Sequence, residues 1–260
     1  MIPGHTGPMG YAVHRAGDRF TTTTDWLSSA HSFSFGDHYD PGNTHHGVLL
    51  VHNDETLRPG EGFATHPHRE TEIVTWVRSG SLVHQDSRGN NGIVYPGLAQ
   101  RMSAGRGIEH SERNDTWTSP DGLRVEGAGA IDVDYVQMWV MPDEFGLDPG
   151  YDQADVSEQL AAGGLIPIAS GDPRLDSAIR IANRSATLWV ARLSRGQRVA
   201  IPGGRFVHLY VTDGAMRLDG RLITAGDAVR GTDVGGELLV GDSAETAEVL
   251  VWVMSITLGE

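Results

Sequence analysis

The chain consists of short apolar runs, each bounded by glycine, proline, asparagine or aspartate. Valine, isoleucine, threonine and aromatic residues dominate these runs, which have the length and composition of β-strands. Clear examples are GVLLVHND, EIVTWVRSGSLVHQDSRGNNGIVYPG, VDYVQMWVMPD, FVHLYVTDGAMRLDG and EVLVWVMSITL. Apolar positions with a helical period are hard to find outside residues 151–164 and the stretch from Trp26 to Ser29. The pattern therefore predicts an all-β protein.

A weak internal repeat relates the two halves of the chain. VTWVRSGSLVHQDSRGNNGIVYPG and LYVTDGAMRLDGRLITAG both follow the order strand, glycine turn, strand, turn, strand, glycine. Gly80 and Gly214 lie 134 positions apart, and Gly97 and Gly226 lie 129 apart. Two similar offsets predict a duplicated β-barrel or jelly-roll unit.

The two copies are joined by a segment that is typical of a linker. MPDEFGLDPGYDQ is rich in proline, glycine and aspartate, and it begins next to residue 142. At 260 residues the chain is long enough for two domains, each with its own core. We therefore expect an N-terminal domain over residues 1–142 and a C-terminal domain over residues 143–260.

The composition is that of an ordinary globular protein, with 39% hydrophobic and 21% charged residues. No run approaches the roughly 18 consecutive apolar residues that a membrane-spanning helix needs. The first residues, MIPGHTGPMGY, lack the basic stretch and apolar core of a signal peptide. We expect a cytoplasmic protein that does not bind membranes.

Two residue types are absent, and their absence excludes several kinds of chemistry. Without cysteine the chain has no disulfide, thiolate metal site or cysteine nucleophile. All 20 basic residues are arginine, which excludes a Walker A phosphate loop and a Schiff-base lysine. A bound metal would have to use histidine nitrogens and carboxylate oxygens.

The formal net charge of −14 argues against nucleic acid as a partner. A chain this acidic repels the phosphate backbone, and its arginines are dispersed along the sequence instead of forming a basic stripe. We expect no direct contact with nucleic acid.

Histidine and glutamate recur with a two-residue spacing in two glycine-flanked segments. GFATHPHRETEIVTWVRSG contains His66 and His68, and GRGIEHSERN contains His110 and Glu112. Residues two apart on a strand point to the same face, so two adjacent antiparallel strands would bring all four together. An octahedral metal ion with these four ligands keeps two positions for substrate and dioxygen.

Spacing alone also allows the alternative that these histidines do not bind a metal. The chain has 12 histidines, and the adjacent pair His45 and His46 shows how readily they cluster. We expect the isolated histidines His14, His84 and His208 to be surface residues or satisfied core residues. From spacing, a metal site and scattered histidines remain comparable interpretations.

A family resemblance favours the metal site. GFATHPHRETEIVTWVRSG and PGLAQRMSAGRGIEHSERN resemble the metal-binding region of the pirin family, within the cupin superfamily. DWLSSAHSFSFGDHYDP and VQMWVMP are also similar to pirin segments, in the right order over roughly residues 25–142. The C-terminal half resembles a second cupin domain only in its strand pattern. The resemblance implies an all-β bicupin, made of two cupin jelly-roll barrels.

The resemblance also implies a ligand set. In the pirin pattern His66, His68, His110 and Glu112 bind one metal, usually iron. The wider cupin pattern, His-x-His-x3-Glu, would instead use Glu72 as the carboxylate, and spacing cannot choose between the two. The second half lacks a matching set, so we expect one metal per chain, in the N-terminal domain.

The implied activity is that of an iron(II) quercetin 2,3-dioxygenase, with manganese, cobalt, nickel or zinc as alternative metals. The substrate would be a small aromatic flavonol, whose 3-hydroxyl proton Glu112 would accept. Phe63, Met102 and Trp139 either line the pocket or belong to the core. Two alternatives remain: a redox-responsive transcription cofactor that binds a partner protein without turnover, and a metal-dependent enzyme that acts on another substrate.

Overall fold

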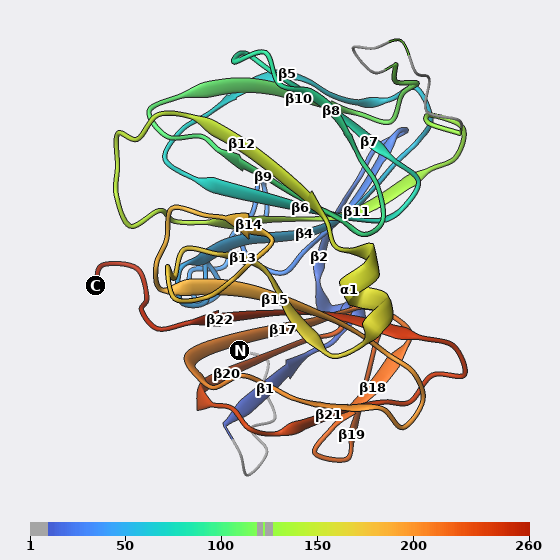
Figure 1. Ribbon diagram of the computed structural model, residues 1–260, viewed down its shortest axis with the longest axis vertical. Coiled ribbons are helices and arrows are strands. Elements are labelled where there is room, and N and C mark those ends of the chain that lie inside the picture. Colours follow the sequence, from blue (N-terminus) through green and yellow to red (C-terminus); the bar gives the residue numbers. More distant parts are fainter. Residues whose placement is uncertain (1–9, 119–121, 123–126) are drawn as a thin grey trace.

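The computed structural model describes residues 10–118, 122 and 127–260. It consists of two β-barrels stacked on each other, each with one seven-stranded and one four-stranded sheet (Figure 1). The predicted all-β jelly-roll architecture is confirmed. Within the described part of the chain, no helix has the length and apolar character needed to span a membrane.

The upper barrel in Figure 1 comes mostly from the first half of the chain. Its seven-stranded sheet contains, in spatial order, β12 (Gly150–Asp155), β9 (Leu98–Ser103), β6 (Glu72–Ser79), β11 (Val133–Val140), β4 (Leu49–Leu57), β3 (Leu27–His31) and β2 (Phe20–Thr23). Its four-stranded sheet contains β5 (Gly62–His68), β10 (Ile108–Arg113), β7 (Leu82–Asp86) and β8 (Asn91–Val94).

The lower barrel has the same two-sheet plan. Its seven-stranded sheet contains β1 (Tyr11–His14), β20 (Ala228–Val234), β17 (Gly204–Asp213), β22 (Ala247–Met254), β15 (Ala186–Leu193), β13 (Leu165–Ser170) and β14 (Ile179–Arg180). Its four-stranded sheet contains β16 (Arg198–Ala200), β21 (Leu238–Gly241), β18 (Ala215–Leu218) and β19 (Arg221–Thr224). Two short helical segments complete the described structure, η1 (Ala16–Asp18) and α1 (Ser157–Ala162).

The internal repeat read from the glycines has a direct structural counterpart. Gly80 and Gly214 lead from the seven-stranded to the four-stranded sheet of each barrel, and Gly97 and Gly226 precede the return. All four have positive φ, and a Cβ on Gly80 would lie 2.7 Å from the Asp132 carbonyl oxygen. The order β9-β6-β11-β4 above therefore matches β20-β17-β22-β15 below.

The two barrels exchange edge strands across the predicted boundary. β12, which follows residue 142, pairs with β9 of the upper barrel. β1, near the N-terminus, pairs with β20 of the lower barrel, with Tyr11 opposite Gly231. The division into residues 1–142 and 143–260 as domains stays a prediction, whereas the sheets themselves do not divide at that point.

Of the two helices predicted from the sequence, one is present in part and the other is absent from the structure. Residues 151–164 form the end of β12 and then α1, so that prediction holds only for its second part. The expectation near Trp26 to Ser29 is wrong, because β3 begins at Leu27 and pairs with both β2 and β4. Hydrogen-bonded pairing with two neighbouring strands stabilises β3 as a strand, despite the weak helical period of its sequence.

The largest hydrophobic core lies between the two seven-stranded sheets. Trp76 and Met138 of the upper sheet contact this core together with Trp252 of the lower sheet, and all three are fully buried. The indole nitrogen of Trp252 lies 3.1 Å from the Met138 sulfur. The barrels are thus joined by a shared apolar layer of the kind found inside a single domain.

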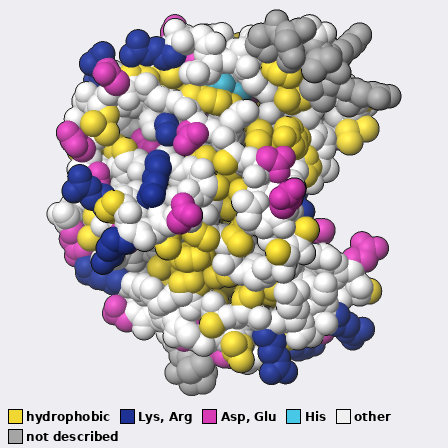
Figure 2. Space-filling model, viewed as in Figure 1, with side chains coloured by type: hydrophobic (Ala, Val, Ile, Leu, Met, Phe, Trp, Pro, Cys, Tyr) yellow, Lys and Arg dark blue, Asp and Glu magenta, His cyan; other side chains and the backbone are white. Residues whose placement is uncertain are grey.

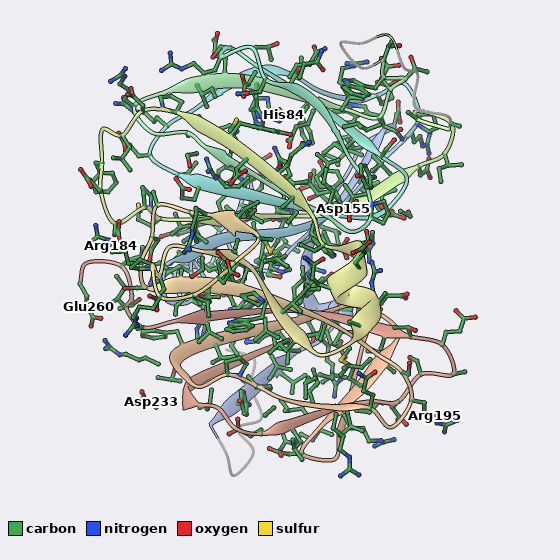
Figure 3. The ribbon with its side chains drawn as sticks, in the orientation of Figure 1. His84, Asp155, Arg184, Arg195, Asp233 and Glu260 are labelled. Carbon is green, nitrogen blue, oxygen red and sulfur yellow. The ribbon has the colours of Figure 1, made fainter. Side chains whose placement is uncertain are left out.

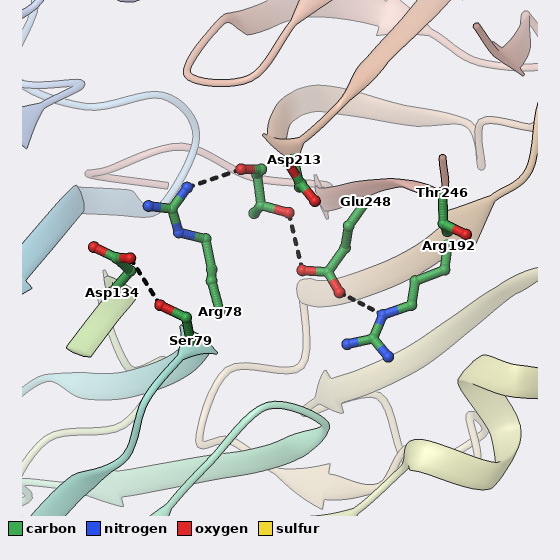
Figure 4. A pocket seen from close by; sticks show the side chains of 8 residues that line it. Arg78, Ser79, Asp134, Arg192, Asp213, Thr246 and Glu248 are labelled. Atoms are coloured by element: carbon green, nitrogen blue, oxygen red, sulfur yellow. Dashed lines mark hydrogen bonds and ion pairs between the residues drawn. The ribbon is translucent and has the colours of Figure 1, made fainter. Parts of the chain in front are cut away.

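A polar cluster closes one end of this layer. Glu248 accepts hydrogen bonds from Trp76 Nε1 at 2.8 Å, Thr212 Oγ1 at 2.9 Å and Arg192 Nε at 2.7 Å. Glu248, Thr212 and Arg192 line, together with Arg78, a cleft of about 510 Å³ between the barrels (Figure 4). Arginine and acidic side chains are interspersed over the face shown in Figure 2, which is hollowed between the two halves. Glu248 is buried, and its three donors offset the cost of burying its charge.

Two buried histidines also meet between the sheets. The rings of His52 and His208 lie 4.8 Å apart, and both residues are 0% exposed. Burial holds the pKa of each well below its ordinary value. Within the described residues, His52 Nε2 and both ring nitrogens of His208 lack a hydrogen-bond partner. His208 is therefore a core residue, as expected, but not a satisfied one.

We predict that Trp76→Phe lowers the free energy of unfolding by about 1–3 kcal/mol, because it removes buried volume and a donor to Glu248. Trp117→Phe is the matched control, since its indole N–H bonds Asn91 near the surface. That change should stay within about 0.5 kcal/mol. Urea unfolding of both variants checks the prediction, and equal losses would contradict it.

We predict that the buried histidines make the fold sensitive to acid. Below about pH 6.5 a histidine of the unfolded chain binds a proton that folded His208 does not bind, so stability falls as the pH falls. His208→Leu should remove up to about 1.4 kcal/mol of this loss per pH unit between pH 6.5 and 4. Val207→Ala should lower stability without changing its pH dependence. Unfolding free energies measured across this pH range test the prediction. If stability depends on pH in His208→Leu as it does in the unchanged protein, His208 is not the source of the acid sensitivity.

Candidate metal centre

The two segments with paired histidines form adjacent strands, as their spacing predicted. β5 and β10 are antiparallel, with His110 opposite His66 and Glu112 opposite Phe63. A β-bulge interrupts the pairing between His110 and Glu112. The extra residue of this bulge lies on β5, between Phe63 and His66, because β10 pairs with β7 through His110 and Glu112 without a shift. The bulge lets Phe63 and His66, three positions apart, both line one cavity, while His110 and Glu112 keep the common face of a regular strand.

Three of the four predicted ligands meet at one point inside the upper barrel. The rings of His66, His68 and His110 lie 4.5–4.9 Å from one another, measured between centroids. One nitrogen from each ring lies within 4.8 Å of the other two. Three imidazole nitrogens at this separation can bind one metal ion.

The proton positions on these rings leave nitrogen lone pairs free. His66 Nδ1 lies 2.8 Å from the Ala64 carbonyl oxygen, which can only accept, so Nδ1 carries the proton and Nε2 the lone pair. His68 Nε2 and His110 Nε2 are buried and have no hydrogen-bond partner among the described residues. Burial, followed by the neighbouring imidazoles, lowers the pKa of His68 to about 4. Neutral rings with free lone pairs are what a metal requires, so these residues fit one.

The sequence interpretation did not identify His84 as part of this cluster of potential ligands. It lies on β7 inside the upper barrel (Figure 3), and of the two expected placements, surface or satisfied core, it has the second. Its Nε2 is 3.3 Å from Asp86 Oδ2, and its Nδ1 is 3.5 Å from His110 Nδ1. If His84 donates to Asp86, then His84 Nδ1 accepts from His110 and the lone pair of His110 lies on Nε2. The signal available in the sequence was the same two-residue spacing, between His84 and Asp86.

Glu112 is held by an amide whose orientation is fixed. Gln137 Nε2 donates to both carboxylate oxygens of Glu112, at 2.9 and 2.8 Å. Trp139 Nε1, which can only donate, lies 3.0 Å from Gln137 Oε1 and so sets the direction of the amide. Glu112 is buried and shares a group of potential ligands with His84 and His110.

Glu72, the alternative carboxylate, points elsewhere. Its Oε2 accepts from Ser103 Oγ at 2.7 Å and from the backbone N–H of Ala182 at 3.0 Å, so it joins the two barrels. Neither group of potential ligands found among the described residues includes it. The placement favours Glu112, although the identity of the carboxylate ligand stays a prediction.

A cavity of about 570 Å³ opens beside these ligands. His66, His68 and Glu112 line it, together with the aromatic side chains of Phe63 and Trp139. Met102, by contrast, is buried in a separate core cluster. The sequence left open whether Phe63, Met102 and Trp139 line the pocket or belong to the core. Phe63 and Trp139 line the cavity.

A second carboxyl group also lines this cavity. Glu55 accepts from Tyr135 Oη at 2.5 Å and from Ser29 Oγ at 3.0 Å, and it is 5% exposed. Burial, opposed by the Tyr135 hydrogen bond and aided by the charge of Glu112, raises the pKa of Glu55 to about 7. Two buried carboxyl groups in different surroundings, Glu55 and Glu112, therefore line the cavity.

Comparison with known proteins agrees with this geometry. Residues 13–140 match the family model described as Pirin. A Mycobacterium tuberculosis protein named "Putative quercetin 2,3-dioxygenase" is 51% identical over 249 residues, which cover 95% of this chain and 96% of the relative. The quercetin 2,3-dioxygenase of Escherichia coli K12 is 34% identical over 218 residues, with coverages of 84% and 87%.

Solved structures show the same architecture. The crystal structure of YhhW from Escherichia coli matches with a TM-score of 0.81 and 30% identity, over 95% of this chain and 99% of that one. The crystal structure of the same bacterial pirin in complex with nickel(II) matches with a TM-score of 0.79 and 29% identity, over 95% and 100%. The fold is that of two cupin domains.

We predict that two nearly isosteric changes separate the candidate carboxylates. Glu112→Gln removes an anionic ligand and should empty the site of metal. Glu72→Gln should leave most of the metal bound, with at most a roughly 10–100-fold loss of affinity. Metal content by mass spectrometry checks both variants. A full site in Glu112→Gln together with an empty one in Glu72→Gln would reverse the assignment.

Proposed function

The chain belongs to the pirin family, and from this premise we propose that it is a metal-dependent dioxygenase that cleaves flavonols such as quercetin. The observation that carries the proposal is the cavity: His66, His68 and the fixed carboxylate of Glu112 line it, and the ring of His110 lies directly against those of His66 and His68. Its volume lies within the roughly 300–1,000 Å³ typical of sites for small organic ligands.

His66, His68, His110 and Glu112 would hold the metal, which we expect to be iron(II), with nickel, manganese, cobalt or zinc as alternatives. When bound, it supplies Lewis acidity to the flavonol oxygens and electron exchange with dioxygen. The contacts of His66 with Ala64, and of His110 with His84, orient two of the ligands through their second nitrogens.

Glu112 would also accept a proton, from the 3-hydroxyl group of the flavonol. Both of its oxygens face the amide nitrogen of Gln137, which keeps the carboxylate in place and stabilises its negative charge. Trp139 fixes that amide from the other side. Proton transfer from a bound hydroxyl is efficient when the acceptor is positioned in advance.

Glu55 would adjust the charge of the cavity. With a pKa of about 7 it is partly protonated at neutral pH, so that a second full negative charge does not oppose Glu112. Tyr135 and Ser29 hold its oxygens. Phe63 and Trp139 offer apolar surface to a planar aromatic ligand and exclude water from the reacting end.

The proposal is tested by loading metal-free protein with iron, manganese, cobalt or nickel and adding quercetin in air. We predict loss of the visible absorption of quercetin and release of carbon monoxide. Glu112→Gln should be inactive, and Glu72→Gln is the matched control that retains turnover. An absence of turnover with every metal would reject the proposal and favour the alternative of a redox-responsive binding protein.

A further inference from the structure

A continuous row of aromatic rings leads from the metal centre to the surface. Adjacent rings in the row have centroids 4.8–5.7 Å apart. The row contains, in order, His68, Trp139, Phe35, His31, His38 and Phe20. All of these except Phe20, which is 39% exposed, line the cavity beside the metal centre. Three rings lie between His68 and His38 along this row, and we therefore assign these two residues to opposite ends of the cavity.

The wall at this distal end is rigidly built. Phe35 and His38 exchange two backbone hydrogen bonds, of 2.9 and 3.0 Å, which close a tight turn after β3. His31 is fixed between two partners, with Nδ1 2.9 Å from Asn53 Oδ1 and Nε2 2.9 Å from Thr22 Oγ1. Both nitrogens of His31 therefore have hydrogen-bond partners within the protein, so the residue offers only its ring to the cavity.

His38 differs from His31 in having one nitrogen to spare. Its Nε2 lies 3.0 Å from the Thr21 carbonyl oxygen and must donate to it, so Nδ1 carries a lone pair. Among the described residues Nδ1 has no hydrogen-bond partner within the protein. Asp37, the adjacent residue, also lines the cavity and is exposed. A lone pair and a carboxylate both accept hydrogen bonds, so this end suits a ligand that donates them.

We propose that His38 determines specificity by accepting a hydrogen bond from a hydroxyl group on the substrate ring farthest from the metal. The preferred substrates are then flat polyhydroxylated aromatic compounds, with one oxygen pair at the metal end and phenolic hydroxyls at the His38 end. Phe35 and Trp139 contact the aromatic body between them. The identity of the reacting end rests on the proposed function, whereas the distal subsite rests on the row of rings and on His38.

Binding measured without oxygen tests the subsite independently of turnover. Quercetin carries ring hydroxyls, whereas 3-hydroxyflavone has only the 3-hydroxyl. We expect His38→Phe, which keeps a ring against Phe20, to weaken quercetin binding to the metal-loaded protein roughly three- to tenfold. The affinity of His38→Phe for 3-hydroxyflavone should stay within about twofold of that of the unchanged protein, because this ligand has no hydroxyl group that can donate to His38. Calorimetry with each ligand provides the numbers.

Two further variants complete the test. His38→Ala should reproduce the selective loss, since it cannot clash with the turn, and thermal melting verifies that both variants fold. His45→Phe, at a half-buried position outside the cavity lining, should bind both ligands as the unchanged protein does.

The outcomes separate the two proposals. Equal weakening of both ligands, or no effect of either His38 variant, overturns the role of His38 even if quercetin is turned over. Selective weakening without turnover supports the subsite and rejects the dioxygenase. If neither ligand binds the unchanged protein, both proposals are overturned.

Discussion

Strand β11 has to satisfy two environments at once, because successive side chains of a strand point to opposite faces. Val136 and Met138 lie in the apolar layer between the barrels, whereas Gln137 and Trp139 point into the upper barrel toward Glu112. A shift of one residue would bury the amide in the apolar layer and place methionine beside the carboxylate. The register that joins the barrels is therefore also the register that builds the candidate metal centre.

The polar groups inside the upper barrel form two short hydrogen-bonded chains. The indole of Trp139 donates to Gln137, which donates to Glu112. On the other side of the centre, His110 contacts His84, and His84 contacts Asp86. The first chain donates toward the centre and ends on the Glu112 carboxylate, whereas the second donates away from the centre and ends on the Asp86 carboxylate. The first therefore orients carboxylate oxygens at the centre, and the second leaves the lone pair of His110 on Nε2. In a buried environment such chains are stable only when nearly every member is satisfied, which explains why the ligands are supported by strands instead of loops.

Much of the fold could be predicted from the sequence, because its signals are local. Positive-φ glycines at Gly80 and Gly214 mark equivalent turns, and the two-residue spacing of His66 and His68 follows directly from strand geometry. Other features depend on contacts between distant segments. The bulge of β5 between Phe63 and His66 has no clear signature in the sequence, and Gln137 acquires its role only through pairing of β11 with its neighbours. The distal turn at 35–38 lies in a stretch without periodic apolar positions.

The exchange of edge strands has a consequence for how the chain assembles during synthesis. Tyr11 is synthesised 220 residues before its partner Gly231. The nascent chain must therefore carry β1 as an unpaired strand while the upper barrel forms. A strand of four residues exposes few unpaired backbone groups, which limits the opportunity for pairing with a neighbouring nascent chain. Closure of the lower sheet by β1 is a contact of very long sequence separation, and such contacts form slowly. The edge of the lower sheet beside β20 therefore stays open until β1, synthesised long before, reaches it.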